Sequence, residues 1–135
     1  MAAPYYVLEK LPDEPILIST MGTQYLVSRH MVLSDGEIAG ILEASDESLF
    51  VIADISQVPF SYNDIVMGSA QGARGKAPLW HHPKIRKMIF ISRFNLVKLA
   101  AKTLSTKYFG NLNVKVFDTR EEALIYCRAQ DAIKA

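Results

Sequence analysis

The chain has 135 residues, the length of one ordinary domain. Half of the residues are hydrophobic and 21% are charged, which excludes an intrinsically disordered chain. No hydrophobic run exceeds five residues, whereas a membrane-spanning helix needs about 20, so we expect no membrane insertion. The single cysteine cannot form an internal disulfide, and the N-terminus lacks the basic start and apolar core of a signal peptide. We therefore expect a cytoplasmic protein.

The net charge of +1 hides an uneven distribution along the chain. Residues 1–70 hold two basic and ten acidic side chains, a net charge of −8, whereas residues 71–135 hold thirteen basic and four acidic ones, a net charge of +9. The basic stretch 74–107 could contact an anionic partner. Alternatively, the two halves neutralise each other within the fold or across a dimer. A near-neutral total charge and the lack of an RNA-binding sheet motif speak against nucleic acid.

The first half of the chain predicts two strands, at residues 5–8 and 15–20, joined by a turn. Residues 22–33 fit either an extended strand or a loop. Ser34 and Glu37 have the spacing of a capping box, in which a serine side chain accepts a bond from the third helical N–H. We therefore expect a helix that begins at Ser34 and ends near Ser45.

Residues 49–55 form a continuous run of apolar, mostly branched side chains without alternation. Such a run is typical of a strand buried on both faces, in the centre of a parallel sheet. Ser61 is expected to cap the next helix. Helical spacing predicts an inward face for that helix made of Tyr62, Ile65, Val66, Ser69, Ala70 and Ala73.

The second half continues with a buried strand at 87–92, a helix capped by Asn95 and ended by Gly110, and a strand at 114–117. Thr119 and Glu122 form another capping box before the last helix, whose core face includes Cys127. The expected order is ββαβαβαβα. It predicts a single α/β domain over residues 1–135, with a mostly parallel sheet and an N-terminal antiparallel hairpin.

Two segments resemble the SpoIIAA-like group of STAS domains, the fold of bacterial anti-anti-sigma factors. Val51-Ile52-Ala53-Asp54-Ile55-Ser56, followed by Val58 and Phe60, is similar to the family's strand before its switch helix. The stretch Val116-Phe117-Asp118-Thr119-Arg120-Glu121-Glu122-Ala123-Leu124 is similar to its terminal strand and helix. The resemblance covers nearly the whole chain in element order. It implies a bacterial regulatory module that binds a protein and is not an enzyme.

The chain departs from this family at the phosphorylated position. The family has Asp-Ser-Ser-Gly where this sequence has Tyr62-Asn63-Asp64-Ile65. This window holds no serine or threonine, and the adjacent Ser61 fits better as a helix cap. The switch-equivalent positions are therefore Ser61, Asn63 and Asp64, and we expect no phosphorylation there. Asp64 could mimic a permanent charge, or it could simply favour the helix dipole.

Ligands of open α/β sheets bind at the carboxyl ends of the parallel strands. Asp54, Ser56, Arg93 and Asn95 fall at this edge and are candidates for a ligand or anion site. The alternative is structural, with Asp54 paired to Arg93 and Asn95 acting as a helix cap.

Leu79 and Trp80 lie in a loop bounded by prolines and could anchor a homodimer, or could instead fill the core. His81, His82 and His30 do not have the spacing of a metal site. Cys127 is expected to be an inert core residue, and no nucleophile–base pair is visible. We expect no cofactor and no metal.

Two functions remain open. The first is a non-enzymatic module that binds a protein. The second is a carrier of a small molecule or lipid, with its site at the carboxyl ends of the strands. A closed apolar cavity would favour the carrier, and an exposed apolar patch would favour the module.

Overall fold

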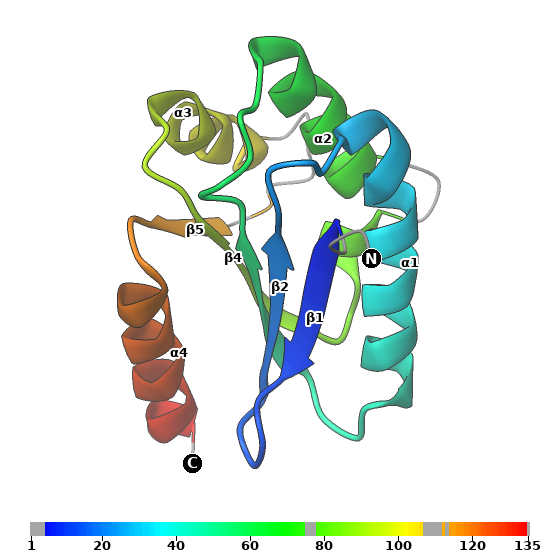
Figure 1. The fold of residues 1–135 in the computed structure, drawn as a ribbon. Helices are drawn as coiled ribbons and strands as arrows, with labels where there is room; N and C mark the ends of the chain where they lie inside the picture. Colours follow the sequence, from blue (N-terminus) through cyan, green and yellow to red (C-terminus); the bar gives the residue numbers. More distant parts are fainter. Residues whose placement is uncertain (1–4, 75–77, 107–111, 113, 135) are drawn as a thin grey trace.

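The computed structural model describes residues 5–74, 78–106, 112 and 114–134. Its centre is a five-stranded sheet in the order β1-β2-β3-β4-β5 (Figure 1). The strands are β1 (Tyr6–Lys10), β2 (Ile16–Met21), β3 (Leu49–Asp54), β4 (Ile85–Ile91) and β5 (Val114–Phe117). β1 and β2 are antiparallel, and every later pair is parallel. The predicted α/β class, the order of strands and helices along the chain and the N-terminal antiparallel hairpin are confirmed.

β3 lies in the middle of the sheet, as its sequence predicts. It pairs with β2 on one side and β4 on the other. Leu49, Val51 and Ile52 have no exposed surface. The absence of alternation is explained because both faces of the strand are covered by helices.

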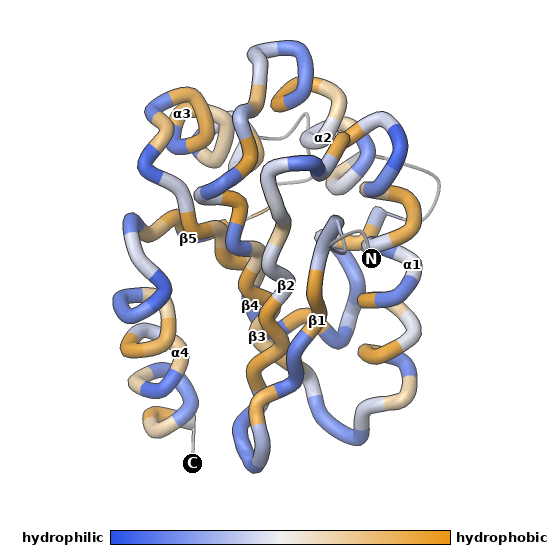
Figure 2. Tube along the Cα trace, viewed as in Figure 1, coloured by the Kyte–Doolittle hydropathy of each residue, from blue (hydrophilic) through white to orange (hydrophobic). Residues whose placement is uncertain are grey.

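The helices cover the sheet unequally. They are α1 (Val27–Ala44), α2 (Tyr62–Arg74), α3 (Asn95–Leu104) and α4 (Arg120–Lys134), with a short 3-10 turn η1 (Leu79–His81) before β4. One core cluster joins the sheet to α1, α2 and α3, and a second joins its other face to α4. Figure 1 shows α1 and α4 on opposite sides of the sheet, and Figure 2 shows the hydrophobic strands between them.

The first helix begins earlier than predicted. α1 starts at Val27, so Ser34 lies inside the helix and is fully buried rather than capping it. The Ser34 hydroxyl lies 2.9 Å from the hydroxyl of Tyr25 and donates to the carbonyl of Met31. At the true start of the helix, the Leu26 N–H donates to His30 Nδ1 at 2.8 Å. The predicted capping box at Ser34 is wrong because buried partners satisfy its hydroxyl.

The cap of the second helix is confirmed, but its predicted inward face is only partly right. The Asp64 N–H donates to Ser61 Oγ at 3.1 Å, and the Ser61 N–H donates to Asp64 Oδ2 at 2.9 Å. Ile65 packs against the core, whereas Tyr62 and Val66 are exposed, as is Ala70. The helix is rotated in this way because its glycines face the protein: Gly72 touches the ring of Trp80.

The third helix has no side-chain cap. Asn95 is the first helical residue, and the preceding Phe94 occupies the N-cap position. The Phe94 N–H donates to Ser92 Oγ at 3.0 Å. Asn95 is therefore not the cap that the sequence predicted. The helix ends at Leu104, and the predicted stop at Gly110 lies outside the described residues.

The start of the last helix agrees with the sequence. The Glu122 N–H donates to Thr119 Oγ1 at 3.2 Å, which confirms the Thr119 cap. Cys127 is fully buried between α4 and the sheet, as expected for a core residue. Burial raises the pKa of its thiol to about 12.

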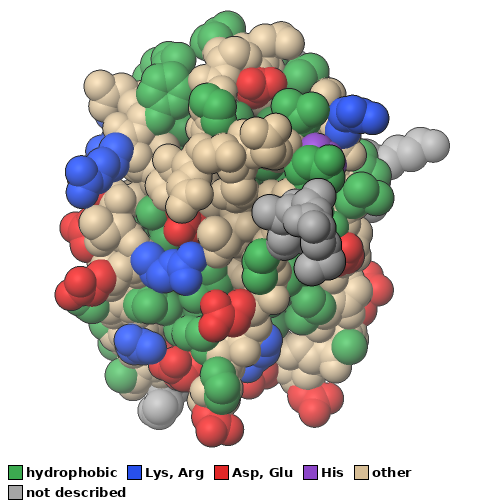
Figure 3. All heavy atoms as spheres, viewed as in Figure 1, with side chains coloured by type: hydrophobic (Ala, Val, Ile, Leu, Met, Phe, Trp, Pro, Cys, Tyr) green, Lys and Arg blue, Asp and Glu red, His purple; other side chains and the backbone are tan. Residues whose placement is uncertain are grey.

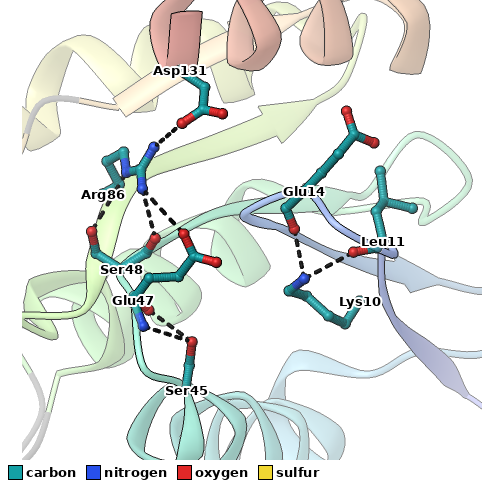
Figure 4. Close-up of polar contacts among 8 residues, drawn as sticks. All are labelled: Lys10, Leu11, Glu14, Ser45, Glu47, Ser48, Arg86 and Asp131. Atoms are coloured by element: carbon teal, nitrogen blue, oxygen red, sulfur yellow. Dashed lines mark hydrogen bonds and ion pairs between the residues drawn. The ribbon is translucent and has the colours of Figure 1, made fainter. Parts of the chain in front are cut away.

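Ion pairs join the acidic and basic halves of the chain. Glu14 pairs with Arg128 at 2.7 Å, and Arg86 contacts Glu47 at 3.9 Å. Figure 4 shows Arg86 held between Glu47, the Ser48 carbonyl and Asp131 of α4. Mutual neutralisation within the fold therefore accounts for part of the charge asymmetry. Among the described residues, no helix is long and apolar enough to cross a membrane.

Candidate functional site

The carboxyl edge of the sheet holds a compact polar cluster. Asp54 ends β3, and its Oδ1 accepts bonds from the Ser56 N–H at 3.1 Å and the Ser56 hydroxyl at 2.6 Å. Its other oxygen, Oδ2, lies 3.3 Å from Arg120 Nη2. The same Arg120 nitrogen donates to Thr20 Oγ1 at 2.8 Å. The cluster joins β2, β3 and the first residue of α4.

Two of the four predicted edge residues come together, and two do not. Asp54 and Ser56 are in contact, but the predicted structural partner of Asp54, Arg93, is not the residue that binds it. Arg93 and Asn95 are exposed beyond β4. Asp54 pairs with Arg120 and not with Arg93, because the start of α4 lies directly over the end of β3. The sequence signal for Arg120 was its place just after the last strand, at the same edge of the sheet.

Arg93 lies instead near another carboxylate. The Asp118 side chain accepts from Lys98 Nζ at 2.9 Å. This bond and the nearby charges of Lys98 and Arg93 hold the pKa of Asp118 below its usual range. Asp54 and Asp118 therefore each have a cationic partner already, in Arg120 and Lys98.

The switch-equivalent residues lie at the exposed start of α2. Ser61 and Asp64 bind each other's backbone N–H groups in the reciprocal arrangement of a capping box. Asn63 is exposed beside them. The Ser61 hydroxyl and the Asp64 carboxylate, which could accept or imitate a phosphate group, thus both cap the start of the helix.

An exposed apolar stripe runs along α2. Tyr62 is 69% exposed and Val66, one turn later, is 48% exposed. Met67 is adjacent, and Phe94 and Leu99 add exposed apolar surface from the α3 region. Figure 3 shows hydrophobic side chains gathered at the end of the molecule that α2 and α3 form. Hydrophobic periodicity placed Tyr62 and Val66 in the core. The spacing of Gly68 and Gly72 was the signal that the helix is rotated, so that the glycines and Ile65 face inward.

A cavity of about 90 Å³ lies between the sheet and helices α1, α2 and α3. Its walls are mainly apolar and include Met31, Ile38, Ile65, Met88, Phe90 and Trp80. Two carboxylates, Asp35 and Asp64, also line it. Burial raises the pKa of Asp35 to about 7.

Sequence reasoning missed Asp35 because the misplaced helix start put it in an exposed first turn. In the structure it is the ninth residue of α1, which begins at Val27. It lies one position after the buried Ser34. The signal for an earlier helix start was a set of residues at helical spacing: Val27, Met31, Ser34 and Ile38. The same spacing places Asp35 at the border of the buried face.

The proposed interface pair is buried in the monomer. Leu79 is 4% exposed and Trp80 is 8% exposed. The Trp80 ring lies edge-on to Phe90, with 5.2 Å between ring centroids. Both residues therefore contribute to the core. The homodimer predicted through them stays a prediction, and it would require this loop to open.

The histidines have local partners. The Lys84 N–H donates to His82 Nδ1 at 3.1 Å, and His82 Nε2 lies 3.7 Å from Glu43. The ring of His30 stacks on Tyr5 with 3.8 Å between centroids. Within the described ranges, no three His, Cys, Asp or Glu side chains are placed to hold a metal ion.

Comparison with known proteins identifies the fold alone. No family model matches the sequence, and no curated protein matches it. The structure is similar to an uncharacterised protein of the DUF3478 family with a SpoIIAA-like fold from Shewanella loihica PV-4. The TM-score is 0.53 and the sequence identity 16%, and the match covers 94% of this chain and 98% of that one. The chain therefore has a SpoIIAA-like fold.

Proposed function

We propose that this chain is a non-enzymatic, STAS-like regulatory module that binds a protein partner through α2. The observation that carries the proposal is the exposed stripe of Tyr62 and Val66. Large apolar side chains on one helix face are characteristic of protein-docking surfaces. The SpoIIAA-like fold agrees with the resemblance to STAS domains, which implies a module that binds a protein.

The proposed docking works without the serine phosphorylation typical of anti-anti-sigma factors. Ser61 is the adjacent serine, and its Oγ accepts a hydrogen bond from the Asp64 N–H. A phosphate on Ser61 would stand beside the Asp64 carboxylate and repel it. We therefore expect affinity to come from the apolar stripe, with Asp64 adding a fixed negative charge at its edge.

The second function, a carrier, is favoured by the cavity beneath the helices. Its volume of about 90 Å³ is below the roughly 150 Å³ of a cavity that admits benzene. A lipid chain would need more space. The carboxyl edge of the strands, where the carrier site was expected, has Asp54 already bonded to Ser56 and Arg120. We therefore place protein binding first.

A homodimer is a further proposal, and a second copy is one partner that the stripe could bind. Light scattering at low and high salt tests it. Val66→Asp should dissociate a dimer formed through α2, and Trp80→Ala should dissociate one formed through η1. A monomer at micromolar concentration in low salt would contradict self-association.

Affinity capture from native extract tests the docking proposal. The wild-type chain is compared with Val66→Asp and with Ile125→Asp, a matched control because Ile125 is 61% exposed on α4. A partner bound at α2 should be lost with Val66→Asp and retained with Ile125→Asp. Equal retention by both variants would contradict docking through α2.

A further inference from the structure

The cavity beneath the helices combines an apolar interior with a negatively charged border. Most of its walls are apolar, and its only ionisable side chains among the described residues are Tyr25, Asp35 and Asp64. No described lysine, arginine or histidine lines it. A bound ligand would therefore meet hydrophobic surface inside and carboxylates, with no described cationic side chain beside them, at the border.

Asp35 marks the mouth of this cavity. Together with Leu79 it lines both the cavity and an outer groove between α1, α2 and the loop before β4. Asp64 already accepts a hydrogen bond from the Ser61 N–H, but the described structure gives the Asp35 carboxylate no hydrogen-bond or ion-pair partner. The charged form of Asp35 is disfavoured by burial alone, which raises its pKa to about 7. A cation at this point would supply the missing partner.

The volume sets the size of the apolar part of a ligand. About 90 Å³ is roughly three times a water molecule's share of the liquid, which corresponds to an aliphatic chain of about three or four carbons. An anion is disfavoured because both neighbouring carboxylates would repel it. A neutral hydrocarbon would fill the interior but offer Asp35 neither a charge nor a hydrogen bond, and an alcohol would offer it a hydrogen bond without a charge.

We propose that this cavity binds a small primary alkylamine, with a chain of about four carbons in the apolar interior and the ammonium group at Asp35. The cavity borders the docking surface at Asp64, but neither Tyr62 nor Val66 lines it, so this proposal does not depend on the docking proposed above. The ligand enters tail first from the outer groove, because Asp35 lies where the cavity and the groove meet.

Methyl NMR of the intact chain, observed at Met31 and Ile38 inside the cavity, tests the proposal with n-butylamine as the probe. A ligand with so few atoms should saturate with a Kd of about 1 to 10 mM. n-Butanol and pentanoate, which share the alkyl chain but lack a positive charge, should bind at least tenfold more weakly. Nα-acetyl-lysine N-methylamide should not bind, since its backbone blocks tail-first entry.

Three variants locate the site. Asp35→Asn should weaken n-butylamine binding at least tenfold, and Asp46→Asn, which changes an exposed aspartate after α1, should leave it unchanged. Ala101→Leu should abolish binding by filling the interior, because Ala101 lines the cavity. The proposal is overturned if the wild-type methyl signals do not shift saturably, or if Asp35→Asn binds as well as the wild type. Equal binding of the lysine derivative would overturn the tail-first orientation.

Discussion

Replacing Gly72 with alanine should destabilise the protein, although alanine is the better helix former. A Cβ atom at position 72 would lie 2.2, 2.4 and 2.5 Å from the Cε2, Cδ2 and Cζ2 atoms of Trp80. The indole cannot easily move away, because it is 8% exposed and packs edge-on against Phe90. The helix backbone or the Trp80 ring must therefore shift.

The size of the effect follows from two opposing terms. Glycine to alanine in a helix interior gains about 1 kcal/mol from propensity, whereas forcing extra volume into a packed core costs about 1–3 kcal/mol. Because the overlap involves three ring atoms, we expect the upper part of that range and a net loss of about 1–2 kcal/mol. With a urea m-value of about 1–3 kcal/mol/M, the unfolding midpoint should fall by about 0.3–2 M.

Urea unfolding of matched variants separates the clash from general effects. Gly40→Ala is the control, since a Cβ at that position of α1 meets no atom within 4 Å. It should raise the free energy of unfolding by about 0.5–1 kcal/mol. In a Trp80→Leu background, Gly72→Ala should cost less, with a coupling energy of about 0.5–3 kcal/mol. This account of the packing is refuted if Gly72→Ala is as stable as the wild type. It is also refuted if Gly72→Ala lowers the free energy of unfolding by the same amount in the Trp80→Leu background.

Two other predictions concern buried groups. Asp35 binds a proton more tightly in the folded chain, since its pKa is raised from 3.8 to about 7, so stability should fall as pH rises from about 4 to 7. Asp35→Asn should remove this loss, so its free energy of unfolding, measured with urea, should exceed that of the wild type by about 2–4 kcal/mol at pH 8 and differ little at pH 4. Equal pH profiles of the two proteins would contradict this prediction. Cys127 has no exposed surface and a pKa raised to about 12. Its thiol should resist an aromatic disulfide reagent at pH 8 in buffer and react in urea, whereas fast reaction in buffer would show that α4 opens readily.

The sheet could be predicted from the sequence, because its central strand has a pattern that few other structures produce. Residues 49–55 are apolar without alternation, and β3 is covered on both faces. Capping boxes were less reliable. Ser61 and Ser34 begin similar motifs, but only Ser61 is exposed at a helix start, whereas Ser34 finds Tyr25 and Met31 as buried partners. The motif alone does not show that the helix begins earlier, at Val27, and that Ser34 faces the core.

The candidate sites were harder to predict, because their residues come from distant parts of the chain. The pairing of Asp54 with Arg120 joins residues 66 positions apart in the chain, so it depends on how α4 crosses the sheet. The exposed stripe on α2 was hidden because apolar spacing cannot distinguish a core face from a docking face. The position of Trp80 over Gly72 decides which side of α2 turns inward.

Photo-crosslinking in living cells of the native organism tests the central claim most directly. A photoreactive phenylalanine analogue replaces Tyr62 or Val66 on the α2 stripe, and Ile125 on α4 as the control. The account predicts one and the same protein crosslinked from positions 62 and 66, and none of it from position 125. Failure to crosslink any protein from the stripe, or equal capture of the same protein from position 125, would contradict a docking function centred on α2.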